Sequence, residues 1–332
     1  MRHLLLAVLL WAAPAAAGNA DFAAWLERYK AAAAERGVRP EWLAQALVDL
    51  APSERIVALD RNQPGDSGVR AVFSAYLARQ LTVDRIAEGR RMKDRWATAS
   101  ARAEADHGVP REILLGILGM ETNYGRFTGN FDVLQALATL AWDGRREALF
   151  TRELDAAVQM LGEGRATRAQ MRGSWAGAMG LPQFLPSSYL AHAVDGDGDG
   201  RADIWNSVPD TLASIGNYLK NHGWQAGLGW GFATRVPAGF DPASVALTEQ
   251  PTSCVRPMQA HSRFLTAAEW RARGFQPLNA AWPADEVEMS FVQPDGPGTS
   301  AYLTTRNYRA LMAYNCSNFY ALSVALLADA LR

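Results

Sequence analysis

The stretch HGVPREILLGILGMETNYGRFTG, from His107 to Gly129, decides the fold of this chain. Pro110 stands where a helix would begin, a position at which the missing proline N–H is not needed. Apolar residues then fill nearly every position up to Met120, which predicts a helix buried on all sides. Gly125 and Gly129 supply the turns that end it. The stretch therefore predicts one short buried helix around which the rest of the chain is organised.

A single carboxylate, Glu121, ends this apolar run. Burial disfavours the charged form of a carboxyl, and the negative end of the helix dipole lies at the same end of the helix, so both effects raise its pKa. A carboxyl that stays protonated near neutral pH is what a general acid requires. From this segment alone, the commoner explanation remains a glutamate that is hydrogen-bonded to the turn or to a buried partner.

The N-terminal residues 1–17, MRHLLLAVLLWAAPAAA, have the pattern of a secretory signal peptide. A basic start precedes an apolar run from Leu4 to Ala13, which is too short for a transmembrane helix, and small residues follow. We expect cleavage after Ala17, with Ala20 as an alternative site. The other interpretation of the segment is an amphipathic N-terminal helix that is not removed. No cysteine follows the run, so the lipid attachment of a bacterial lipoprotein is excluded. We therefore expect a soluble, exported, periplasmic protein without a membrane span.

Composition narrows the remaining possibilities. The chain has 332 residues, about two or three domains' worth, and a formal net charge of −1, which favours neither nucleic acid nor an anionic surface as partner. Its two cysteines, Cys254 and Cys316, form either one disulfide in an oxidising compartment or two buried free thiols. Sequence separation alone does not distinguish these two states.

Most of the chain has helical periodicity. Apolar spacing predicts helices within 21–51, two helices within 69–106, and further helices over 133–142, 145–161, 208–223 and 302–332, with a loop at 62–67. Between residues 232 and 300, valine, threonine and proline replace the alanine-rich pattern, which predicts a small β-containing insertion. The predicted fold class is therefore α+β and mainly α-helical.

A glycine- and proline-rich stretch, GSWAGAMGLPQFLPSSY, spans Gly173 to Tyr189. It is too rich in these residues for regular structure, yet it also carries aromatic and apolar side chains. Such a loop is either the wall of a binding groove, where backbone approaches a ligand closely, or a tightly packed structural turn. Composition alone favours neither.

The acidic stretch DGDGDGRADIWN, from Asp195 to Asn206, matches most of an EF-hand calcium loop. Gly200 stands at position six, where the chain turns sharply, and Asp203 stands at position nine. Asn206 replaces the glutamate of position twelve, so Asp210 is the candidate closing acid. A solvated acidic turn is the alternative, but closely packed like charges favour a bound cation, with calcium preferred over magnesium. The predicted ligands are Asp195, Asp197, Asp199, the carbonyl of Arg201, and Asp210.

Several motifs in a fixed order resemble the membrane-bound lytic murein transglycosylase B family. They are GVPREILLGILGMETNYG, GSWAGAMGLPQFLPSSY, the acidic loop, IGNYLKNHGW and YNCSNFYALSVALLA, and together they cover the chain from about Phe22 to its end. The resemblance implies a lysozyme-like catalytic core over 101–231, completed by a C-terminal helix over 301–332. Residues 21–100 would form a helical N-terminal elaboration, and 232–300 the β-containing insertion.

The resemblance also implies an activity and its residues. The family cleaves the β-1,4 bond between N-acetylmuramic acid and N-acetylglucosamine in peptidoglycan and leaves a 1,6-anhydromuramoyl end. Glu121 matches the catalytic glutamate, and the acidic loop matches a calcium-like loop whose last acid lies beyond the twelfth position, as Asp210 does. We expect glycan strands as substrate, other cell-wall enzymes as partners, and no organic cofactor. The matched substrate-binding residues are Ser174, Gln183, Tyr218, Tyr314, Asn315 and Tyr320.

A lone carboxylate fits a substrate-assisted reaction. Glycosidases normally use two carboxyl groups, but Asp132 and Asp143, the acids in neighbouring loops, match no motif of the family. The resemblance implies that Glu121 acts as acid and then as base, with the N-acetyl group placed by Asn315. A muramidase that uses water would instead need a second ionised carboxylate facing Glu121. Two functions without catalysis also stay open, a peptidoglycan-binding protein and a calcium-dependent structural module.

Overall fold

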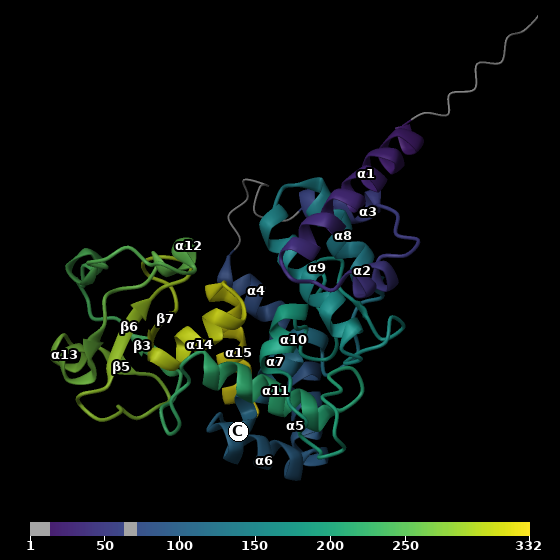
Figure 1. Cartoon of the computed structure of the whole chain (residues 1–332). Helices are drawn as coiled ribbons and strands as arrows, with labels where there is room; N and C mark the ends of the chain where they lie inside the picture. The colour runs from purple at the N-terminus through teal and green to yellow at the C-terminus, as the bar shows by residue number, and fades with distance from the viewer. Residues whose placement is uncertain (1–13, 63–71) are drawn as a thin grey trace, which may run out of the picture. The chain divides into compact units, whose positions relative to one another are not determined.

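The computed structural model describes residues 14–62 and 72–332 (Figure 1). The chain forms two compact units. Among the described residues, the first comprises 14–62, Gly129–Met179 and Phe184–Leu190, and the second comprises 72–128, Gly180–Gln183 and Ala191–Arg332. Because the chain passes between the units several times, they do not coincide with consecutive segments of sequence. Most of the predicted leader and of the predicted loop at 62–67 lies outside the described residues.

The first unit is helical apart from one two-stranded pair. Helix α8 packs against α9, α3 and α1, and α9 also packs against α2. Strands β1 (Phe131–Asp132) and β2 (Arg172–Gly173) pair antiparallel, and Asp132 then caps α8 by accepting the N–H of Gln135 at 3.0 Å. Helix α10 (Pro186–His192) begins in this unit. The other helices are α1 (Pro14–Glu35), α2 (Pro40–Ala46), α3 (Glu54–Arg61), α8 (Val133–Asp143) and α9 (Glu147–Gly162).

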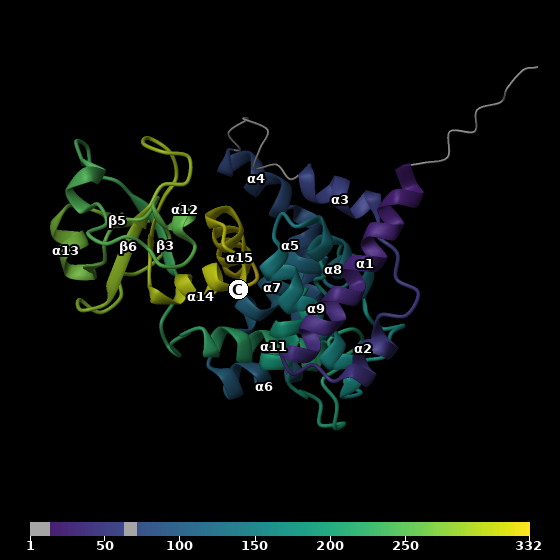
Figure 2. The ribbon, with the colours of Figure 1, turned by 45° about the horizontal axis from the view of Figure 1, so that its top comes forward.

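The second unit is built around α7 (Arg111–Thr122), the helix predicted at the centre of the fold. Its residues from Ile113 to Gly119 are all buried, as their apolar character on every face predicted. Helix α7 packs against α15, α5, α11 and α6 (Figures 1 and 2). The surrounding helices are α4 (Phe73–Gln80), α5 (Val83–Arg95), α6 (Ala97–His107), α11 (Val208–Asn221), α14 (Arg306–Tyr314) and α15 (Asn318–Ala330). The sequence had predicted two helices where α4, α5 and α6 form three.

Two glycines let neighbouring segments approach α7 closely. A Cβ atom on Gly116 would lie 3.0 Å from the backbone oxygen of Val324 in α15. A Cβ on Gly119 would lie 2.6 Å from the ring of Tyr124, which folds back over the end of the helix. Ordinary side chains at these positions would therefore push apart the elements that hold the end of α7 in place.

The predicted β-containing insertion is an antiparallel five-stranded sheet with the order β4-β6-β7-β3-β5. Its strands β3, β5 and β6 are labelled in Figure 2. It packs over a core that includes Trp270, Phe275 and Phe291. The strands are β3 (Gly231–Arg235), β4 (Leu265–Thr266), β5 (Gln276–Pro277), β6 (Glu288–Val292) and β7 (Ala301–Thr304). Short helical turns η1 (Pro242–Val245), α12 (Val255–Met258) and α13 (Ala267–Ala272) lie between them.

Strand β7 corrects the predicted helix over 302–332. Residues 301–304 pair with β6 on one side and β3 on the other, and helix begins only at Arg306. All four residues of β7 are buried. A strand buried on both faces lacks the alternation of apolar and polar residues that would have distinguished it from the helix that follows.

Two further observations concern questions that the sequence left open. Cys254 and Cys316 form a disulfide, with their Cα atoms 5.4 Å apart. Among residues 14–62 and 72–332, no single helix is both long and apolar enough to cross a membrane; α14 and α15 meet that requirement only as a pair, which is bent by 114°.

We expect Gly119→Ala to destabilise the protein, although alanine usually favours a helix by about 0.5–1 kcal/mol. The added methyl group meets the Tyr124 ring at 2.6 Å, and overpacking of this kind costs about 1–3 kcal/mol. Urea unfolding should show a lower free energy of unfolding. The matched control is Gly229→Ala, because nothing lies within 4 Å of that Cβ position. Equal stability of Gly119→Ala and the parent would contradict the close packing at this helix end.

Candidate active site

Glu121 lies in the last turn of α7, and the backbone that follows it turns sharply. Asn123 and Tyr124 both adopt left-handed conformations, with φ angles of 49° and 60°. The Thr122 hydroxyl donates to the carbonyl oxygen of Leu181 at 3.1 Å and accepts the N–H of Gly125 at 3.0 Å. These bonds fix the turn, and through it the direction of the half-buried Glu121 side chain.

Two opposing effects set the ionisation of Glu121. Burial removes water from the carboxyl group and raises its pKa to about 7, while a hydrogen bond from Tyr320 lowers it. The Tyr320 hydroxyl donates to Oε1 of Glu121 at 2.5 Å. The carboxyl is therefore poised to exchange a proton near neutral pH, which suits a group that first gives and then takes a proton.

Tyr314 and Tyr76 also lie within electrostatic range of Glu121. Burial raises the pKa of each phenol, and the charge of Glu121 raises it further. The Tyr314 hydroxyl donates to the carbonyl oxygen of Pro182 at 2.7 Å, which orients its ring. Tyr76 was not predicted as a site residue, because its spacing from Phe73 on α4 is that of an ordinary amphipathic helix.

Three further predicted substrate-binding residues of the second unit differ in their hydrogen bonds and in their exposure. The Tyr218 hydroxyl donates to the carbonyl oxygen of Ala313 at 2.8 Å, and its ring centroid lies 4.8 Å from that of Tyr314. Gln183 has a positive φ of 52°, and its amide donates to the carbonyl oxygens of Thr128 and Gly180 at 3.1 and 2.9 Å. Asn315 follows the end of α14 and is exposed.

Ser174 belongs to the first unit, whereas the other predicted substrate-binding residues belong to the second. Its hydroxyl accepts the N–H groups of Ala176 and Ala178 at 3.3 and 3.0 Å. Gly173 is required beside it, because a Cβ atom there would lie 2.0 Å from the oxygen of Ala178. In the structure this part of the glycine-rich stretch is a tight hydrogen-bonded loop, which was one of its two interpretations.

The two other acids considered from the sequence are engaged in ion pairs within the first unit. Asp132 pairs with Arg168 at 2.9 Å, and Asp143 pairs with Arg61 at 2.5 Å. The pKa of Glu121 is shifted by burial and by Tyr320, with no contribution from another carboxylate among the described residues. A pair of carboxyl groups of the usual glycosidase kind is therefore not what sets the ionisation of this site.

The acidic loop brings three of the predicted metal ligands together. Ligand oxygens of Asp195, Asp197 and Asp210 lie within 4.8 Å of one another. Asp210 is buried and accepts N–H groups of the loop, from Gly196 at 2.9 Å and from Asp203 at 2.7 Å. The carboxylate of Asp199 instead accepts the N–H of Arg201 at 2.9 Å. Three clustered carboxylate oxygens suit a hard divalent cation.

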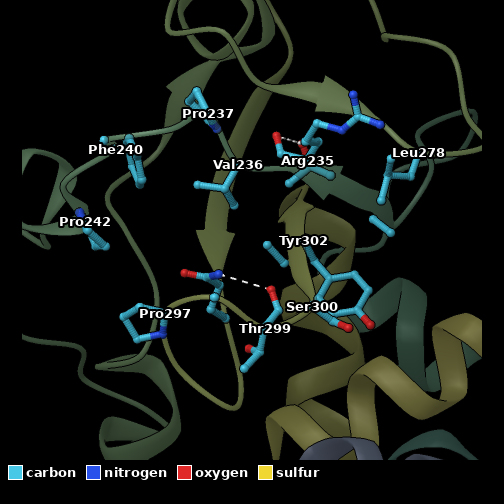
Figure 3. Close-up of a pocket in the computed structure, with 16 residues that line it drawn as sticks. Arg235, Val236, Pro237, Phe240, Pro242, Leu278, Pro297, Thr299, Ser300 and Tyr302 are labelled. Atoms are coloured by element: carbon cyan, nitrogen blue, oxygen red, sulfur yellow. Dashed lines mark hydrogen bonds between the residues drawn. The ribbon is translucent and has the colours of Figure 1, made fainter.

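A separate cavity of about 520 Å³ lies in the β-containing insertion (Figure 3). Prolines and the aromatic side chains of Phe240 and Tyr302 line it, and Arg235 is the one charged residue of its lining. None of the residues predicted for substrate or metal binding belongs to it.

Glu121→Gln should raise stability at alkaline pH and leave it unchanged near pH 4. The folded state holds the Glu121 proton up to a pKa of about 7, whereas the ordinary value is 4.5, so ionisation destabilises the folded state as pH rises between these values. Since one pKa unit corresponds to about 1.4 kcal/mol, the gain above pH 7 should approach about 3 kcal/mol.

Thermal unfolding of both proteins at pH 4 and pH 8 measures this difference. Glutamine conserves the volume and accepts the same hydrogen bond from Tyr320. Glu249→Gln, which changes an exposed carboxylate, serves as control and should show no pH-dependent gain. Equal melting temperatures of Glu121→Gln and the parent at pH 8 would mean that the folded protein does not raise the pKa of Glu121.

Comparison with known proteins supplies relatives over nearly the whole chain. The transglycosylase SLT domain family matches residues 21–329. Membrane-bound lytic murein transglycosylase B of Escherichia coli K12 is 32% identical over 270 residues, which cover 80% of this chain and 68% of that protein.

Solved structures of lytic transglycosylases are also similar to this chain. SltB3 of Pseudomonas aeruginosa, in complex with NAG-anhNAM-pentapeptide, is 36% identical, with a TM-score of 0.83 over 93% of this chain and 79% of that one. The Escherichia coli lytic transglycosylase Slt35, in complex with calcium, is 28% identical, with a TM-score of 0.74 over 95% and 93%. The predicted mainly helical, lysozyme-like fold class is confirmed, and the chain belongs to the lytic transglycosylase family of membrane-bound lytic murein transglycosylase B.

Proposed function

We propose that this peptidoglycan lytic transglycosylase uses Glu121 as its single acid and base and produces 1,6-anhydromuramoyl ends. The observation that carries the proposal is the Glu121 carboxyl, whose pKa burial raises to about 7 and whose Oε1 accepts the Tyr320 hydroxyl. The SltB3 complex with a NAG-anhNAM-pentapeptide supports the anhydro product by similarity.

Protonated Glu121 first donates its proton to the glycosidic oxygen, and the bond from C1 of N-acetylmuramic acid to that oxygen breaks. The carboxylate that results is stabilised by the hydrogen bond from Tyr320. It then accepts the proton of the C6 hydroxyl as the C6 oxygen bonds to C1. Protons balance, no water is consumed, and Glu121 ends as it began. Because the nucleophile belongs to the substrate, a high effective molarity replaces an activated water.

The remaining residues hold the glycan around this carboxyl. The hydroxyls of Tyr218 and Tyr314 are bonded to backbone carbonyl groups, so their rings are held in fixed orientations and offer faces on which sugars stack. Asn315, exposed at the end of α14, supplies an amide to the N-acetyl group of the muramoyl residue. Gln183 orders its own loop of the second unit through its hydrogen bonds to backbone carbonyl groups, and Ser174 orders the glycine-rich loop of the first unit.

The acidic loop holds a calcium ion that stabilises the second unit. Its support is the cluster of Asp195, Asp197 and Asp210 oxygens, together with the calcium complex of Slt35. Asp199 and the carbonyl oxygen of Arg201 are further ligands by their positions in the loop. The ion would offset the repulsion between the clustered carboxylates and fix the loop before α11.

The protein acts in the cell-wall compartment. Peptidoglycan lies there, and residues 1–17 have the pattern of a secretory leader. The disulfide between Cys254 and Cys316 fits an oxidising compartment. Glycan strands are the substrate, and other cell-wall enzymes are the expected partners.

Mass spectrometry of soluble products from purified peptidoglycan tests the activity. The parent protein should release muropeptides lighter by one water than those with reducing ends. Glu121→Gln should lose at least about a hundredfold in rate, because the acid–base group is gone while the volume is conserved. Glu249→Gln is the control and should keep full activity. Products with reducing ends would indicate a muramidase, and binding without products would indicate a non-catalytic protein.

Calcium should raise the melting temperature, and a chelator should reverse the rise. A ligand that binds only the folded state stabilises it by about 2.7 kcal/mol at a hundred times its Kd. Asp210→Asn should abolish the shift, because Asp210 contributes ligand oxygens and also accepts the N–H groups that shape the loop. Asp285→Asn, a change in a surface ion pair, should keep it. Identical melting curves with calcium and with chelator would rule out the cation.

A further inference from the structure

The junction between α14 and α15 supplies several of the residues proposed for catalysis. Tyr314 ends α14, Asn315 follows it, and Tyr320 lies in the first turn of α15. The two helices meet at an angle of 114°. Ser317 caps α15 by accepting the N–H of Tyr320 at 3.3 Å. A small change in the backbone of this junction would therefore redirect side chains on both helices.

A segment of the β-containing insertion anchors the junction. Cys316 forms the disulfide with Cys254, 62 residues earlier in the chain. Two residues beyond it, the buried Asn318 donates its amide N–H to the carbonyl oxygen of Pro257 at 2.7 Å. Residues 254–261 are thus joined to the junction by one covalent bond and by a set of buried hydrogen bonds.

His261 completes this anchor. The Asn318 amide nitrogen donates to Pro257, so the Asn318 side-chain oxygen can only accept a hydrogen bond. His261 Nε2 therefore carries a proton and donates it to this oxygen at 2.8 Å. The Tyr308 hydroxyl donates to the same oxygen at 3.1 Å. The hydrogen bonds hold α15 from Asn318 onward, whereas the disulfide holds the residue directly before Ser317.

Asn315 depends on the disulfide more than its neighbours do. Tyr314 and Tyr320 are oriented through their hydroxyls, by Pro182 and Glu121. Within the part of the chain that the structure describes, the Asn315 side chain makes no hydrogen bond; its backbone N–H donates to the Leu311 carbonyl oxygen at 3.3 Å, and its carbonyl oxygen accepts the N–H of Ser317, the residue after Cys316, at 2.7 Å. The direction of this exposed side chain is therefore set by its backbone, which is covalently tied at the next residue.

We propose that the Cys254–Cys316 disulfide is a positioning element of the active site, which fixes the backbone at Asn315 and thereby places its amide against the N-acetyl group of the substrate. This inference rests on the proposed function. The fold does not depend on the disulfide alone, because Asn318, Tyr320 and much of α15 are buried in the core of the second unit. Cys316 is exposed, so a thiol reductant can reach the bond.

Reduction provides a direct test, since the chain has only these two cysteines. A small dithiol supplies two electrons and two protons, breaks the S–S bond into two thiols, and is itself oxidised to a cyclic disulfide. Reduced protein should lose about tenfold to a hundredfold in kcat for soluble glycan, because displacement of a positioning group by about 1 Å costs that much. Reoxidation should restore the rate. The alkaline limit of the pH profile, set by Glu121 and Tyr320, should not move.

The double variant Cys254→Ser/Cys316→Ser gives the same comparison without reductant, at a temperature at which circular dichroism shows it folded. Should it not fold, the reduced parent protein, checked for thiols and for its near-UV spectrum, carries the test. Reduced or variant protein that keeps its kcat within about twofold overturns the proposal.

Asn315→Ala distinguishes positioning from a general loss of stability. It should lower kcat strongly when the disulfide is intact and add little further when the disulfide is reduced, because both changes remove the same interaction. Additive losses would overturn the proposal, since the disulfide would then act elsewhere. Products of the slowed enzyme should still carry anhydro ends; parent protein that made reducing ends would contradict the proposed function instead.

Discussion

The hydrogen bond between Tyr320 and Glu121 sets the arrangement of the candidate active site in the second unit. It joins residues 199 positions apart, the end of α7 and the start of α15. Burial raises the pKa of the Glu121 carboxyl and the hydrogen bond from the Tyr320 phenol lowers it, and the balance of the two effects places this pKa at about 7. That balance requires the helices to approach closely, which Gly116 allows at the point where its Cβ would face Val324. An apolar setting that would otherwise be ordinary core thus holds a carboxyl group whose pKa is about 7.

Several polar side chains of the candidate site donate hydrogen bonds to backbone carbonyl groups. Tyr314 and Gln183 donate to carbonyl oxygens of loops, and Tyr218 donates to the carbonyl oxygen of Ala313 in α14. Such bonds give the backbone carbonyl groups a donor and remove rotational freedom from the side chains, so the site is ordered before a glycan enters. In the proposed mechanism the chemistry needs only one titrating group, and recognition of the glycan rests on the ring faces of the tyrosines and on a few side-chain amides.

The sequence predicted the parts of this arrangement that are local. The helix that leads to Glu121 is apolar on every face, and the acidic loop has carboxylates at alternate positions. Each of these features can be predicted from a short stretch of sequence. Tyr76 was not predicted as a site residue, and Tyr320 was predicted to bind substrate but not to contact Glu121, because these contacts join segments that are distant in the sequence. Strand β7 was taken for helix since it is buried on both faces. The pairing of Cys254 with Cys316 stayed open because separation along a chain does not fix distance in space.

The insertion leaves and re-enters the helical part of the chain at one place. Its first strand begins at Gly231 and its last ends at Thr304, and these two residues lie opposite each other in neighbouring antiparallel strands. A Cβ on Gly231 would lie 2.2 Å from the oxygen of Leu303, so the segment that enters the insertion and the segment that leaves it are in close contact. Modules with adjacent ends can be lengthened, shortened or exchanged during evolution without displacing the helices on either side. Here such an exchange would also remove Cys254, so the module and the junction at Asn315 are expected to diverge together.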